Sequence, residues 1–87
     1  MRDNDPLSGT PAQRAIAANV RVELARANIS GAQMARRIDI AQSTFARRMT
    51  GDASFSAEEI AGIAAELGIS ADALLVGAAE RAEANVA

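Results

Sequence analysis

The amino-acid sequence predicts an all-α fold: a compact domain of five short helices with a helix-turn-helix at its centre. Apolar residues recur at helical spacing through most of the chain, which favours amphipathic helices. Three Ser or Thr residues each precede a Gln or Glu by three positions, the spacing of a capping box at a helix start. No stretch shows the alternation of apolar and polar residues that is typical of a strand, and 87 residues fit a single domain.

The composition restricts both the core and the chemistry. Only Phe45 and Phe55 are aromatic, so aliphatic side chains and Ala must fill most of the core. Cys and His are absent, which removes disulfides, thiol nucleophiles and the commonest general base and metal ligand. The chain also lacks a Gly-rich phosphate loop, so we expect no enzyme, no metal site and no cofactor.

Neither a membrane span nor a signal peptide is expected. No apolar run approaches the roughly 20 residues that cross a bilayer. The first ten residues lack the apolar stretch of a signal peptide. We therefore expect a cytoplasmic protein with no membrane partner.

The polar residues 1–9 are expected to form a mobile arm. Thr10 has the features of an N-cap, with a Pro at the first helical position and Gln13 completing the capping box. The first helix should cover residues 11–27. Asn28 should end it, because Asn tolerates the left-handed backbone of a helix C-terminus.

The stretch 29–51 should form two short helices joined by a tight turn. Ser30 and Gln33 have the capping-box spacing at its start, and Asp39 stands at the bend, where a left-handed backbone is needed. The second helix should begin at Ala41 and present polar residues on its outer side. A helix pair whose second member is basic and rich in hydrogen-bonding groups is typical of a DNA-reading helix-turn-helix.

The C-terminal half should add two more helices. Ser56 caps the first, with a Glu three positions later, and Gly68 ends it in the left-handed conformation. Ser70 is expected to start the last helix and Gly77 to interrupt it. The tail should either continue as a helix or fray. We therefore divide the chain into an arm at 1–9, a helix-turn-helix domain at 10–77 and a tail at 78–87.

The charges are unevenly distributed along the chain. The net charge of −2 argues mildly against a nucleic-acid binder. However, residues 30–51 carry four Arg and one Asp, a local charge of +3, whereas residues 52–87 carry seven acids and one Arg, a local charge of −6. Every basic residue is Arg, which favours planar, bidentate contacts to phosphate or guanine.

The pattern ISxxxMAxxIxIxQSTFxRxMxG, which begins at Ile29, resembles the lambda-type repressor and Cro family of helix-turn-helix proteins, also called the XRE type. The resemblance runs from about residue 20 to residue 75. It implies a lambda-repressor-like domain that binds double-stranded DNA, with Phe45 in a buried position. Two positions depart from the pattern: Gly31 stands where relatives often have Gln, and Ala41 where they usually have a capping Ser or Thr.

Base contacts are predicted on the outer face of the second helix of the pair, whose leading end enters the major groove in such proteins. Gln42 can bond adenine, Ser43 several bases, Ala46 a thymine methyl group and Arg47 a guanine or a phosphate. The alternative is that the first two are ordinary solvated residues and Ala46 a spacer. The predicted phosphate contacts are Ser30, Gly31, Gln33, Arg37, Thr44 and Arg48. Arg48 could instead pack on the following helix, and Arg37 could form surface salt bridges.

Three adjacent apolar residues, Leu74, Leu75 and Val76, either close the core or form a dimer surface, as the last helix of the family commonly does. The sequence thus predicts a sequence-specific transcriptional regulator, a repressor or Cro-like protein of phage or prokaryotic type, that binds an operator as a homodimer. The alternative is the antitoxin of a toxin–antitoxin pair, whose acidic half would bind a basic toxin.

Overall fold

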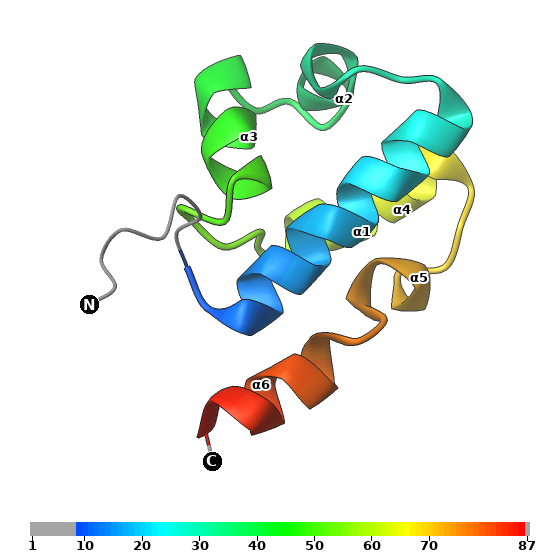
Figure 1. Ribbon diagram of the computed structural model, residues 1–87. Helices are drawn as coiled ribbons and strands as arrows, with labels where there is room; N and C mark the ends of the chain where they lie inside the picture. The colour runs from blue at the N-terminus through cyan, green and yellow to red at the C-terminus, as the bar shows by residue number, and fades with distance from the viewer. Residues whose placement is uncertain (1–8, 87) are drawn as a thin grey trace.

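The computed structural model describes residues 9–86 and contains six helices within them (Figure 1). They are α1 (Pro11–Ala27), α2 (Gly31–Arg37), α3 (Gln42–Met49), α4 (Ala57–Leu67), α5 (Asp72–Leu75) and α6 (Ala78–Val86). No strand occurs among these residues. The predicted all-α fold is therefore confirmed: the five expected helices are present, and the tail adds α6. The arm expected at residues 1–9 lies, except for its last residue, outside the described part of the chain.

Side-chain caps fix three of the helix starts. In each, a Ser or Thr hydroxyl accepts the backbone N–H three positions later, and that residue's side chain accepts the N–H of the cap, at distances of 2.7 to 3.1 Å. The pairs are Thr10–Gln13, Ser30–Gln33 and Ser56–Glu59. Each pair satisfies two N–H groups that a helix start otherwise leaves without partners.

The three residues predicted to adopt a left-handed backbone conformation do so. Asn28 has φ 58°, Asp39 has φ 62° and Gly68 has φ 68°. The start of α5 differs from the prediction. The N–H of Ala73 bonds the carbonyl of Ser70, three residues back, at 3.0 Å, so the chain makes a turn tighter than an α-helix and α5 begins only at Asp72.

The core is aliphatic apart from one buried ring. Phe45 is 2% exposed and meets Phe55 edge to face, with ring centroids 5.7 Å apart, a favourable geometry for an aromatic pair. The buried cluster consists of Val20, Leu24, Met34, Ala35, Phe45, Ile60, Ile63, Ala64 and Leu74. It draws on α1 through α5, so each of these helices is held by a shared interior.

Helix α1 is the element on which most of the other helices pack. It contacts α3, α4, α5 and α6, and Figure 1 shows α2 and α3 to one side of it and α5 and α6 to the other. Asn19 of α1 donates through Nδ2 to the carbonyls of Leu74 at 3.0 Å and Val76 at 2.8 Å. This side chain therefore joins the α5–α6 connection to α1. None of the described helices combines the length and apolar character needed to cross a membrane.

Candidate nucleic-acid interface

The turn between α2 and α3 sets the direction in which α3 leaves the core. Asp39 adopts the left-handed backbone there, and the N–H of Ile40 bonds the carbonyl of Ala35 at 3.0 Å. Ile38 and Ile40 pack against the buried cluster on either side of Asp39. The turn is thus anchored by apolar side chains, and Phe45 then fixes the inner face of α3.

The outer face of α3 carries four exposed residues: Gln42, Ser43, Ala46 and Arg47. These are the residues predicted to contact bases, and their positions one turn apart place them on one side of the helix. Neither α5 nor α6 covers them, since these helices lie on the other side of α1 (Figure 1). The face therefore has an amide, a hydroxyl and a guanidinium available to a partner. The base contacts themselves stay a prediction.

Arg48 is turned away from this face and toward α4. Its Nε donates to Oε1 of Glu59 at 2.6 Å, and the two side chains are only 22% and 15% exposed. The hydrogen bond from Arg48 lowers the pKa of Glu59 below its ordinary value; the backbone N–H of Ser56 acts in the same direction, whereas burial opposes it. Arg48 thus packs on the following helix, which was the alternative role considered for it. A contact between its side chain and phosphate stays a prediction.

Two further contacts at the end of α3 were not foreseen from the sequence. Arg21 of α1 donates through Nη2 to the carbonyl of Met49 at 3.1 Å, where a positive charge suits the negative end of the helix dipole. Arg47 contacts Asp52, with Nε 3.4 Å from Oδ2 and with side chains 65% and 50% exposed. One acceptor is a backbone carbonyl and the other follows the motif in the chain, so a search for basic residues alone misses both contacts.

A depression of about 490 Å³ lies between the start of α2 and the outer face of α3. Gly31 forms part of its wall, and a Cβ added there would stand 3.3 Å from the ring of Phe45. A side chain at position 31 would therefore require the Phe45 ring to shift slightly. Of the predicted phosphate contacts here, Ser30 and Gln33 are exposed, but both side chains also form the cap of α2.

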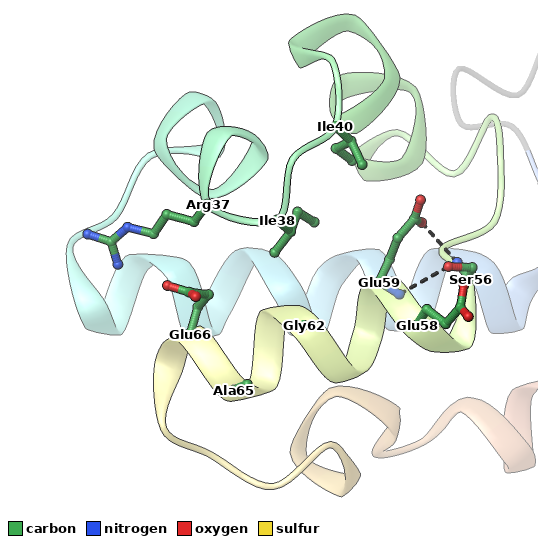
Figure 2. Close-up of a pocket in the computed structure, with 9 residues that line it drawn as sticks. All are labelled: Arg37, Ile38, Ile40, Ser56, Glu58, Glu59, Gly62, Ala65 and Glu66. Atoms are coloured by element: carbon green, nitrogen blue, oxygen red, sulfur yellow. Dashed lines mark hydrogen bonds between the residues drawn. The ribbon is translucent and has the colours of Figure 1, made fainter.

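A second depression, of about 400 Å³, lies between the α2–α3 turn and α4 (Figure 2). Its lining combines the apolar Ile38 and Ile40 with the exposed acids Glu58 and Glu66. Arg37 lies at the Glu66 end of it (Figure 2), on the α4 side of the pair. That position favours a surface salt bridge for Arg37, the alternative considered above, over a contact to phosphate.

The structure corrects one member of the predicted dimer surface. Leu74 is fully buried in the core, whereas Leu75 is 42% and Val76 66% exposed. Leu74 therefore closes the core, which is the other role considered for this segment. Val22 of α1 is a further exposed apolar residue, at 48%. Among the described residues, no group of three or more His, Cys, Asp or Glu side chains is placed to hold a metal ion.

Two crystal structures of the clp gene regulator ClgR from Corynebacterium glutamicum are similar to this chain. One is 22% identical, with a TM-score of 0.71, and the match covers 79% of this chain and 90% of that one. The other is 20% identical, with a TM-score of 0.72, over 86% of this chain and 80% of that one. At these identities the likeness shows a shared fold.

No curated protein matches the chain. The resemblance to helix-turn-helix proteins is supported, whereas membership of the lambda-type repressor and Cro family in particular is not shown. The model of the BetR domain matches residues 11–85, and the chain therefore belongs to the BetR domain family.

Proposed function

We propose that this protein is a sequence-specific transcriptional regulator that binds double-stranded DNA as a dimer and acts in the cytoplasm. One observation carries the proposal: the polar face of α3, with Gln42, Ser43 and Arg47, is exposed while Phe45 on its opposite face is buried. A rigid helix that presents amide, hydroxyl and guanidinium groups has the donors and acceptors that read base edges. The two similar crystal structures are those of a gene regulator, which agrees with this function.

In the proposed complex, the first turn of α3 enters the major groove. Gln42 and Ser43 bond base edges, Arg47 bonds a guanine, and Ala46 lies close enough for a thymine methyl group. Ser30, Gly31 and Thr44 face the phosphates beside the groove. Arg48 keeps its place against α4 and orients α3.

The dimer would place two α3 helices in successive major grooves, roughly 34 Å apart. Leu75 of α5 and Val76, which follows it, are exposed, and α5 lies on the side of α1 away from α3 (Figure 1); these two residues are the proposed contact between protomers. Two-fold dimers are the commonest oligomers. Bound in this way, the protein would repress by occupying an operator and excluding polymerase.

The test begins with selection of duplexes from a random pool, followed by titration of the best duplex at several salt concentrations. We expect a palindromic site, weaker binding as salt increases, and a loss of roughly 1–3 kcal/mol for Gln42→Ala, confined to one base pair of each half-site. Glu66→Gln, which changes an exposed residue of α4, is the control and should leave base preference unchanged. If no sequence is enriched, or if Gln42→Ala binds every duplex as before, the placement of α3 in the groove is wrong.

The acidic side of α4 favours the antitoxin alternative. Glu58 and Glu66 are exposed beside the apolar Ile38 and Ile40 in the depression of Figure 2, which suits a basic protein with an apolar anchor. Under this alternative, the protein would co-purify with a small basic toxin. The charge-reversal variant Glu58→Lys with Glu66→Lys would release that partner while leaving DNA binding intact.

A further inference from the structure

Asp52 stands immediately beyond α3, and the chain folds back there onto Arg47. The carbonyl oxygen of Arg47 accepts three hydrogen bonds: from Oγ1 of Thr50 at 3.0 Å, from the N–H of Asp52 at 3.0 Å and from the N–H of Ala53 at 3.3 Å. Gly51, with φ 84°, allows this reversal, because other residues rarely adopt that conformation. The backbone of Asp52 is therefore fixed relative to the backbone of Arg47.

The same loop is held from its other side by α1. Nε2 of Gln13 donates to Oγ of Ser54, while Oε1 of Gln13 accepts the N–H of Thr10 in the cap of α1. Gly9 packs so closely on the carbonyl of Gly51 that a Cβ at position 9 would overlap it. Asp52 thus belongs to a loop whose backbone is held at both ends.

The carboxylate of Asp52 contacts the guanidinium at Nε, 3.4 Å from Oδ2. End-on recognition of guanine uses the two terminal amino groups, Nη1 and Nη2, toward O6 and N7. The two contacts are therefore compatible on one planar group. An Arg that is already oriented loses less side-chain freedom when it binds than one that must first be ordered.

We infer that Asp52 is a positioning residue for base recognition: its carboxylate orients the Arg47 guanidinium toward a guanine and so contributes to sequence preference. The inference rests on the proposed function of α3. Asp52 also places a negative charge within a Debye length of the duplex that Arg47 would touch, which weakens binding to any sequence. The residue therefore favours discrimination at the expense of general affinity.

The test compares four proteins: the natural chain, Asp52→Asn, Arg47→Ala and the double variant. Each is titrated with the duplex selected from the random pool, with the same duplex in which each G·C pair is replaced in turn by A·T, and with a mixed-sequence fragment. Asp52→Asn keeps the backbone bonds of the loop and removes only the charge. Glu58→Gln, which removes one exposed negative charge from α4 with no contact to Arg47, is the matched control.

We expect Arg47→Ala to lose discrimination at one G·C pair by roughly 5- to 150-fold. Asp52→Asn should lower discrimination at that same pair by about two- to fivefold, which is the fold-change that the energy of an exposed ion pair corresponds to. Binding to the mixed-sequence fragment should become tighter. In the double variant, Asp52→Asn should cause no further loss of discrimination. Glu58→Gln should leave discrimination unchanged.

Three other outcomes overturn the inference and identify the step that failed. If Asp52→Asn tightens binding to all duplexes equally, the carboxylate acts as a charge alone and Arg47 needs no orienting partner. An equal loss of discrimination with and without Arg47 would show that Asp52 acts on the bases or the fold directly. If Arg47→Ala itself keeps full discrimination, the proposed contact of Arg47 with guanine fails together with the inference.

Discussion

Replacing Glu59 by Gln should loosen the attachment of α3 to α4 without disturbing the start of α4. The other two capping boxes of the chain use Gln13 and Gln33 in the equivalent position, so a Gln at position 59 can still accept the N–H of Ser56. The variant therefore removes only the charge of the bond to Arg48. Since charge-assisted bonds are roughly twice as strong as neutral ones, and a neutral bond contributes about 1 kcal/mol, the expected cost is about 1 kcal/mol.

Arg48→Ala should cost more, about 2 kcal/mol, because it also removes the side-chain stem packed between the helices. Thermal unfolding followed by circular dichroism measures both variants. For a domain of this size, 1 kcal/mol corresponds to about 4–8 °C in Tm. The double variant should cost less than the two single losses together, because the pair can be broken only once.

The pair Arg26–Glu23 is the matched control. It is also an Arg–Glu pair, but its distance is longer, at 3.1 Å, and Arg26 is 72% exposed, so Glu23→Gln should cost less than about 0.5 kcal/mol. If Glu59→Gln is no more costly than Glu23→Gln, the Arg48–Glu59 bond does not hold α3 in place, and the orientation of the candidate DNA face must have another cause.

The stability difference between the natural chain and Glu59→Gln should depend on pH with a defined sign. The hydrogen bond from Arg48 lowers the pKa of Glu59 in the folded state, from an ordinary value of 4.5. Its contribution is therefore complete above the unfolded-state pKa and is lost as the pH falls through the lower, folded value. Denaturant unfolding from pH 7 to pH 3 should show the two proteins converging in the acid range; a constant difference across that range contradicts the assignment.

Three further substitutions test, in turn, the buried core, the α5–α6 connection and the proposed dimer surface. Phe45→Ala should destabilise the domain by about 3–5 kcal/mol, seen as loss of cooperative unfolding at room temperature; a well-folded variant would show that the ring is dispensable. Asn19→Ala removes both bonds to the α5–α6 connection and should cost about 1–2 kcal/mol, with amide exchange in α6 accelerating before exchange in α4; equal acceleration throughout would mean that α6 does not open locally. Val76→Asp should leave the Tm nearly unchanged but shift sedimentation toward the monomer, and an unaltered dimer mass would place the interface elsewhere.

The helix boundaries were predictable because local chemistry sets them. Thr10, Ser30 and Ser56 carry their caps within three residues, and Asn28 and Asp39 reveal the left-handed positions by residue type alone. The start of α5 was less predictable. Ser70 has the residue type of a cap, but its hydroxyl accepts the N–H of Asp72, two residues on, and a short polar side chain can satisfy either geometry.

The contacts that orient the candidate site were not predictable, because their partners are distant in the sequence or differ only in direction. Asn19 lies 55 positions from Leu74, whose carbonyl it bonds, and nothing in its neighbourhood marks it as a connector. Arg47 and Arg48 are adjacent and chemically identical, yet one faces solvent and the other α4. A rotation of about 100° per residue separates them, and which direction meets Glu59 depends on how the two helices pack.

The ion pairs of Arg47 and Arg48 reduce the positive charge that the helix pair presents to a partner. The sequence shows four Arg in residues 30–51, but Arg48 is neutralised by Glu59 and Arg47 shares its charge with Asp52. The positive charge that phosphates can meet on α3 is therefore much smaller than the sequence count. A surface of this kind gains little from general attraction to the DNA backbone, the main source of non-specific binding. In the proposed complex, affinity would therefore depend on the proposed contacts of Gln42, Ser43 and Arg47 with bases, which is compatible with a negative net charge.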